Sequence, residues 1–82
     1  MTRYYMQLRD GTEHLLDAEG LEYADIDELK KRVLIAVREL MSEDIKGGVI
    51  DLRFRIDAED REGLIVYTLA FAEAVNIIPD DK

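Results

Sequence analysis

The chain contains no cysteine. This absence excludes disulfide bonds, thiol nucleophiles and cysteine-ligated zinc, and it fits a reducing compartment. The sequence also lacks any apolar run close to the ~20 residues that a membrane-spanning helix needs. The first residues, Met1–Tyr5, contain no apolar run of signal-peptide length. We therefore expect a cytoplasmic protein that has no membrane partner.

Basic residues are scarce as well. Eleven lysines and arginines stand against 19 aspartates and glutamates, which gives a formal net charge of −8. Such a field repels phosphate backbones and anionic lipid, so we expect no nucleic-acid partner. The acidic residues are spread along the whole chain, which is typical of the solvated surface of a folded domain rather than of an acidic tail.

With 82 residues, the chain has room for one domain. We place that domain at residues 1–78 and expect residues 79–82 to fray. Hydrophobic residues make up 48% of the chain, which suffices for one small core but leaves little for a deep active site. A chain of this length buries only roughly 60–65% of the surface of its unfolded form, and dimerisation is a common way to bury more.

The N-terminal quarter predicts a β-hairpin. Apolar and polar residues alternate over Arg3–Arg9, the pattern of a half-buried strand, with inward positions at Tyr4, Met6 and Leu8. The dipeptide Asp10-Gly11 accepts the backbone angles of a tight turn, and Thr12–Leu16 is the expected returning strand. Residues 17–20 (DAEG) then predict a turn that leads into a helix.

The C-terminal third predicts a second hairpin. Val49–Asp57 shows the clearest alternation in the chain, with inward positions at Ile50, Leu52, Phe54 and Ile56. Ala58–Gly63 is polar, ends in glycine and indicates a turn. Leu64–Phe71 is the expected partner strand, with inward positions at Ile65, Tyr67, Leu69 and Phe71. Residues 72–77 are expected to form a helical turn or a short extension.

Between the hairpins, Asp25–Gly48 has the features of one amphipathic helix. Asp25 is a good N-cap and Glu28 completes a capping-box-like pair, while Gly47 and Gly48 favour termination. Helical spacing joins the apolar positions into one stripe, formed by Ile26, Leu29, Val33, Ala36, Val37, Leu40 and Met41, which Leu34 widens. The sum is an α+β, two-layer β-β-α-β-β domain with one helix packed on a four-stranded, mainly antiparallel sheet.

Parts of the sequence resemble a family of small uncharacterised bacterial domains. Residues 3–11 (RYYMQLRDG) are similar to the usual start of that family, R-Y-F-F-H-V-R-D-G, and residues 69–75 (LAFAEAV) are similar to its L-P-F-A-E-A-V ending. The DAEG turn and the helix start at Asp25 match as well. Met6-Gln7 replaces the usual aromatic-histidine pair, and Ala70 stands where proline is usual. The resemblance implies a fold and a bacterial source but no activity.

Catalytic and metal-binding patterns do not emerge from the sequence. His14 is the only histidine, and a triad or an acid–base pair would need a nucleophile or carboxylate on the same face. The acidic residues of the second hairpin lack the spacing and the central glycine of a calcium-binding loop, and they fit a solvated turn; they are Asp57, Glu59, Asp60 and Glu62. We therefore expect no enzyme activity, no cofactor and no metal.

What remains is a surface for protein contacts. Arg53 and Arg55 are predicted to share the outer face of the third strand with Asp51 and Asp57, either as an anion or peptide patch with Tyr5 or Arg9 or as a cross-strand charge ladder. The exposed apolar positions Leu64, Val66 and Ile35 are candidates for a contact patch. We expect an interaction module that binds a second copy, as a homodimer, or another protein through the outer sheet face, or through the edge that the last strand leaves open if it lies outermost. The alternative is a regulatory protein whose acidic surface binds a basic partner, since the hairpin-helix half also resembles antitoxins of the HicB type.

Overall fold

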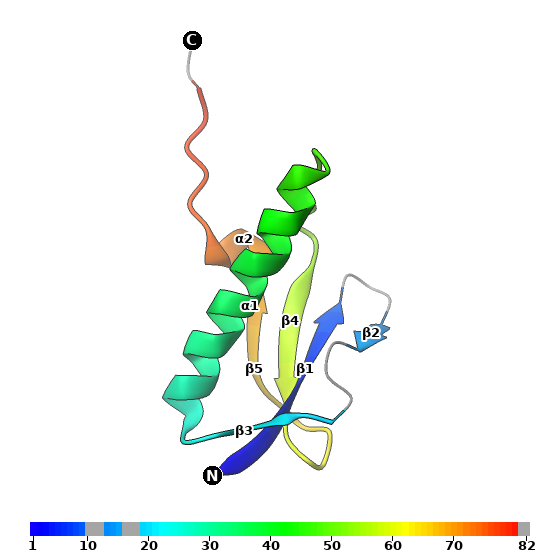
Figure 1. The fold of residues 1–82 in the computed structure, drawn as a ribbon, viewed down its shortest axis with the longest axis vertical. Helices are drawn as coiled ribbons and strands as arrows, with labels where there is room; N and C mark the ends of the chain where they lie inside the picture. Colours follow the sequence, from blue (N-terminus) through cyan, green and yellow to red (C-terminus); the bar gives the residue numbers. More distant parts are fainter. Residues whose placement is uncertain (10–12, 16–18, 81–82) are drawn as a thin grey trace.

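The computed structural model describes residues 1–9, 13–15 and 19–80. The turn predicted at Asp10-Gly11, both ends of the predicted second strand and the first two residues of the DAEG turn lie outside these residues. The elements follow one another along the chain (Figure 1) as β1 (Thr2–Arg9), β2 (Glu13–Leu15), β3 (Leu21–Tyr23), α1 (Ile26–Lys46), β4 (Arg55–Glu59), β5 (Ile65–Ala70) and α2 (Phe71–Ala74). No helix in the described part of the chain is long and apolar enough to cross a membrane.

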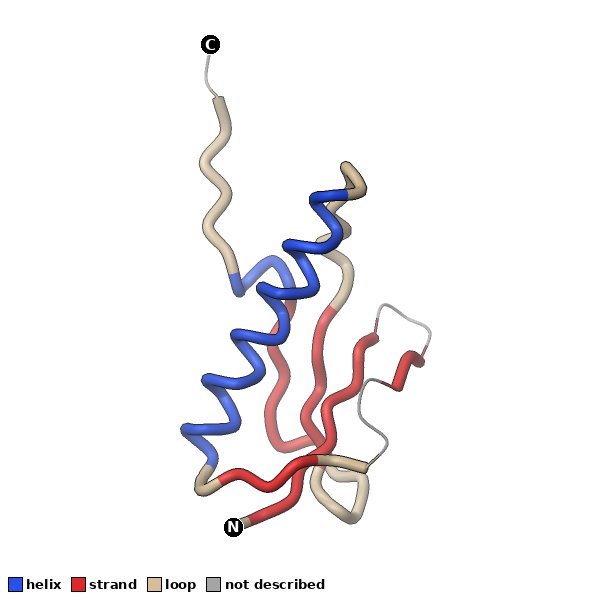
Figure 2. The backbone as a smooth tube through the Cα atoms, viewed as in Figure 1, coloured by secondary structure: helices blue, strands red, loops and turns tan. Residues whose placement is uncertain are grey.

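The strands form one antiparallel sheet in the order β2-β1-β4-β5. The predicted α+β architecture, with one main helix on an antiparallel sheet, is confirmed (Figure 2). Helix α1 lies on one face of the sheet and contacts β3, β4 and β5. One strand was not expected. Short β3 pairs with the first half of β1, residues Thr2–Tyr4, whereas β2 pairs with the second half, residues Gln7–Arg9.

The core lies between α1 and the sheet. Four helix positions spaced four residues apart are buried, and they are Leu29, Val33, Val37 and Met41. They meet buried residues from three other elements, which are Tyr23 from β3, Ile56 and Ala58 from β4, and Phe71 and Ala74 from α2. The apolar stripe of the sequence is therefore the face that packs on the sheet, although Ile26 in the first turn is exposed.

Both predicted helix signals act at the ends of α1. The backbone N–H of Glu28 donates to Asp25 Oδ1 at 2.8 Å, as expected for an N-cap. Glu28 Oε1 in turn accepts from the N–H of Ala24, one residue before the position that a standard capping box uses. At the other end, Gly48 takes a positive φ of 88°, which ends the helix in the left-handed conformation.

The third predicted strand begins later than the alternation indicates. β4 starts at Arg55, not at Val49, because residues before it form a turn. The carboxylate of Asp51 accepts the backbone N–H of Arg53 at 2.9 Å, and this local bond competes with strand pairing. Leu52 consequently points to solvent instead of the core, whereas Phe54 still packs against it.

The second hairpin turn is also shorter than predicted. Ala58 and Glu59 complete β4, so the turn comprises residues 60–63. Asp60 Oδ1 closes it by accepting the N–H groups of Glu62 and Leu64. A register shift between β4 and β5 falls at Ala58 and Glu59. We attribute to this bulge the exposure of Ile65, which was predicted to face the core.

Strand β3 comes close to β1 at Gly20, where a side chain has no room. Gly20 has a φ of +73°, and a Cβ atom there would lie 2.7 Å from the ring of Tyr5 and 2.8 Å from the carbonyl oxygen of Tyr4. We expect Gly20→Ala to lower the free energy of unfolding by more than about 1 kcal/mol in urea titrations. Gly63→Ala is the matched control, because Gly63 has a similar φ of +82° but open space around it. An equal loss in both variants would contradict the close-approach explanation.

Candidate functional site

The face of the sheet opposite α1 carries a hydrogen-bonded network centred on Asp57. This residue lies in the middle of β4, and only 1% of its surface is exposed. Arg9 Nη1 from β1 donates to Asp57 Oδ2 at 2.6 Å, and the hydroxyl of Thr68 from β5 donates to Oδ1 at 2.8 Å. Arg55 Nε, from the start of β4 itself, donates to Oδ1 at 3.2 Å. Three strands thus contribute donors to one buried carboxylate.

Arg9 extends the network toward the second hairpin turn. Its Nη2 atom donates to Glu59 Oε2 at 2.9 Å, so one guanidinium group joins two carboxylates of β4. Gln7 Nε2 donates to Glu59 Oε1, also at 2.9 Å. The register explains these contacts, since β1 pairs Gln7 with Asp57 and Arg9 with Arg55. Two arginines and two carboxylates balance each other in this cross-strand arrangement, and of the predicted charge ladder it includes only Arg55 and Asp57.

The environment of Asp57 keeps its carboxylate ionised. Burial alone would raise the pKa of Asp57, but hydrogen bonds from Arg9, Thr68 and Arg55 outweigh it and hold the pKa below its ordinary value. The hydrogen bonds that Arg9 donates to Asp57 and Glu59, chiefly that to Asp57, raise the pKa of Arg9. The network thus consists of ion pairs and charge-assisted hydrogen bonds between neighbouring strands.

The pKa of Asp57 predicts an acid-sensitive contribution to stability. Since the folded-state pKa is depressed, the contribution is fully present above the unfolded-state pKa, which is about 3.9. It is lost as the pH falls below that value, because the unfolded chain binds the proton first. We expect the melting temperature of the wild type to fall more steeply from pH 5 to pH 2.5 than that of Asp57→Asn, measured by circular dichroism. Parallel curves would contradict this assignment.

The six candidate surface residues do not form one patch. Tyr5 and Arg55 lie on the network face, whereas Ile35 is exposed on α1, which packs on the opposite face. Arg53 does not lie on the network face, because it belongs to the turn before β4. There its hydrogen bond to Asp51 lowers the pKa of the Asp51 carboxyl group to about 2. The predicted pairing of Arg53 with Arg55 on one strand face is therefore wrong.

Leu64 and Val66 belong to an apolar rim at the edge of the sheet. Leu64 is 64% exposed, and the next two residues, Ile65 and Val66, are 48% and 37% exposed. Leu64 directly precedes β5, and Ile65 and Val66 begin it; β5 pairs with β4 on one side, and no strand within residues 1–9, 13–15 and 19–80 pairs with its other side. The expectation that the last strand leaves an open edge is confirmed for the described residues.

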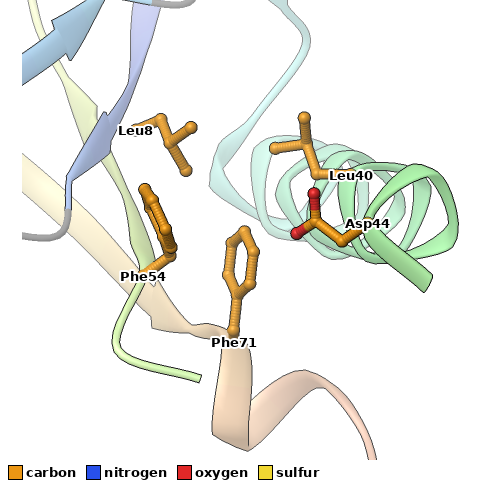
Figure 3. A pocket seen from close by; sticks show the side chains of 5 residues that line it. All are labelled: Leu8, Leu40, Asp44, Phe54 and Phe71. Carbon is orange, nitrogen blue, oxygen red and sulfur yellow. The ribbon is translucent and has the colours of Figure 1, made fainter. Parts of the chain in front are cut away.

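A small apolar cleft lies beside the end of α1 (Figure 3). It has a volume of about 80 Å³ and is lined by Leu8, Leu40, Asp44, Phe54 and Phe71. Ligand pockets for metabolites are typically several times larger, about 300–1,000 Å³. Asp44 is the only ionisable residue of the lining. The cleft is thus too small for a metabolite.

Three of the four acidic residues named for the second hairpin are engaged within the protein. Asp57 and Glu59 pair with Arg9, and Asp60 closes the turn. Across the described part of the chain, no three histidine or acidic side chains come together in a group that could hold a metal ion. His14 lies in β2 opposite Leu8 in the register.

Sequence reasoning placed Asp57 on the outer face but did not identify it as the centre of a network. The missed partners are Gln7 and Thr68, while Arg9 was considered only as a neighbour. One sequence signal could have identified these partners. Polar residues occupy alternate positions of β1, β4 and β5, and this pattern is typical of strands that share one polar sheet face. Their pairing depends on strand order, which periodicity does not provide.

Comparisons with known proteins agree with the resemblance found in the sequence. Residues 3–72 match the family model described as "Domain of unknown function (DUF6894)". No curated protein and no solved structure shows significant similarity to the chain. The matched range begins in β1 and ends in α2, so it includes every strand of the sheet and all of α1. The chain therefore belongs to the DUF6894 family of domains of unknown function.

Proposed function

We propose that this chain is a non-enzymatic interaction module of the bacterial cytoplasm that forms a homodimer through the open edge of β5. The observation that carries the proposal is the combination of an unpaired strand edge with the exposed aliphatic residues Leu64, Ile65 and Val66. Natural proteins blunt free strand edges with charged residues or proline. β5 (IVYTLA) contains neither.

The opposite sheet face contributes less to such a contact. Its charged groups already pair with one another, with Arg9 joining Asp57 and Glu59. A partner that bound there would gain little from these charges, because exchanging an existing ion pair for a new one brings no net attraction. The aliphatic edge, in contrast, gains roughly 25 cal/mol for each Å² of apolar surface that a partner covers.

The oligomeric state tests this proposal. We expect light scattering after size exclusion to give a dimer at micromolar concentrations and Val66→Lys to shift the chain to a monomer. Ile45→Lys is the matched control, since Ile45 is 60% exposed on α1 and lies outside the proposed contact. A wild-type chain that stays monomeric, or equal effects of the two lysine variants, would overturn the proposal.

An alternative function is binding of a basic partner by the acidic surface, as in a regulatory or antitoxin-like protein. The net charge of −8 favours it. The acidic groups for such a contact would have to come from outside the network, for example from exposed Asp27, Glu39 and Glu43 on α1. The probe is a small basic protein encoded by a neighbouring gene. If a pull-down at low salt with this chain as bait fails to recover that basic protein, the alternative is removed.

A further inference from the structure

The last described segment of the chain, residues 75–80, extends away from the domain (Figure 1). We call it the C-terminal arm. Its first residue, Val75, has extended backbone angles, with a φ of −137° and a ψ of 156°. Ile77 and Ile78 in its middle are 60% and 83% exposed. Two neighbouring isoleucines in an extended segment outside the core leave unusual apolar surface uncovered for so small a domain.

The domain itself sets the direction in which the arm leaves. Short α2 is anchored by buried Phe71 and Ala74. At its end, Arg38 Nε from α1 donates to the carbonyl oxygen of Ala74 at 3.0 Å. Because this bond holds the last residue of α2 against the main helix, the arm starts from a fixed point and does not turn back along β5.

The charge pattern sets this part of the chain apart. Charged residues make up 37% of the sequence, yet Glu73 is the only charged residue from Leu64 to Pro79. Glu73 has a local task, since its Oε1 atom accepts the N–H of Ala70 at 3.1 Å. The segment from the open strand edge to Pro79, which includes all of the arm except Asp80, is thus almost free of the charges that keep a surface solvated and a strand edge unpaired.

We propose that the C-terminal arm of one copy adds as a strand to the open edge of β5 in a second copy, and that the second copy returns the same contact. This inference rests on the proposed homodimer and names the segment that builds it. β5 comprises six residues and the part of the arm before Pro79 comprises four, so at about 3.3 Å per residue they span about 20 Å and about 13 Å. A reciprocal exchange of this kind has the closed two-fold symmetry that most dimers have.

Side chains and backbone both suit the exchange. The strand edge offers unpaired backbone groups, and an added strand satisfies them while its alternate side chains contact the neighbouring surface. Ile77 and Ile78 would cover the aliphatic residues of β5, including Ile65 and Val66, which are exposed in the single chain. Pro79 has no backbone N–H and is tolerated at the end of a strand, so it sets the outer limit of pairing.

A disulfide experiment tests the contact directly, because the natural chain has no cysteine. Ile78→Cys and Val66→Cys are prepared as separate proteins, one with a short tag, then mixed and oxidised. We expect a covalent heterodimer that is separable by size from either homodimer. Ile45→Cys replaces Val66→Cys in the control mixture, and there we expect little heterodimer, because Ile45 lies on α1.

Removal of the arm supplies the second readout. A chain that ends at Asn76 should keep its circular dichroism spectrum and its melting temperature at high dilution, while its dimer dissociation constant rises at least about tenfold. A truncated chain that dimerises as well as the full chain would overturn the arm exchange and leave the edge dimer intact. A full chain that is monomeric would overturn both. A third protein combines Ile78→Cys and Val66→Cys in one chain. If this chain forms an internal disulfide while the mixture of single variants forms no heterodimer, the arm folds onto its own β5, and the proposal is overturned.

Discussion

Replacing Asp57 with alanine is expected to lower the free energy of unfolding by about 3–5 kcal/mol, the usual cost of removing one partner from a buried ion pair. The carboxylate is 1% exposed and receives hydrogen bonds from Arg9, Arg55 and Thr68. Its removal leaves the guanidinium group of Arg9 with one carboxylate partner fewer in a half-buried position. Urea titration followed by circular dichroism at pH 7 measures the loss.

The control for Asp57→Ala is Glu43→Ala. Glu43 also pairs with a basic residue, Lys46, but both side chains are largely exposed. Exposed pairs contribute little to stability, so we expect the unfolding midpoint of Glu43→Ala to stay close to that of the wild type. Asp57→Asn should fall between the two variants, because an amide can still accept the hydroxyl of Thr68. A midpoint for Asp57→Ala close to that of Glu43→Ala would show that the network does not stabilise the fold.

The network also bears on how the sheet chooses its register. A slip of one residue between β1 and β4 would turn Arg9 from the polar face to the core face and Leu8 from the core face to the polar face. Because Asp57 is buried, the slipped arrangement would leave its charge without this partner. We therefore infer that the polar face specifies the β1–β4 register together with the apolar face.

Local signals were enough to predict the helix and the overall architecture. The cap at Asp25, the four-residue spacing from Leu29 to Met41 and the left-handed Gly48 are all read from nearby residues, and the structure confirms each of them. The same local logic failed at β4. Alternation from Val49 onward predicts a strand, but the hydrogen bond from Arg53 to Asp51 forms a turn that the pattern does not reveal.

Long-range features were harder to derive. β3 has only three residues, too few for periodicity to show, and it forms because Thr2–Tyr4 offers a pairing edge. The link between Arg9 and Asp57 spans 48 residues and depends on β1 lying beside β4. Face assignments such as that of Arg55 follow from alternation, whereas partners follow from strand order, which is a property of the whole fold.

Replacing Phe71 with alanine is expected to be the other large loss, about 3–5 kcal/mol. Phe71 is 1% exposed, and its ring lies 5.7 Å from the ring of Phe54. Its backbone N–H also donates to the carbonyl oxygen of Phe54 at 3.0 Å, which joins α2 to the segment before β4. The alanine variant would enlarge the small cleft that Phe71 lines with Leu8 and Leu40.

For a domain of this size, a loss of 3 kcal/mol corresponds to a fall in melting temperature of at least about 12 °C. Differential scanning calorimetry measures it, and Phe71→Leu is the matched control, because it keeps most of the buried volume and should lose much less.

The measurement is best made at several protein concentrations. If the chain dimerises as proposed, the melting temperature of every variant rises with concentration, because association stabilises only the folded state. Since the alanine disturbs the base of α2 from which the arm begins, we expect Phe71→Ala to show a weaker concentration dependence than Phe71→Leu. Equal melting temperatures for the two variants would contradict the role of Phe71 as a core residue.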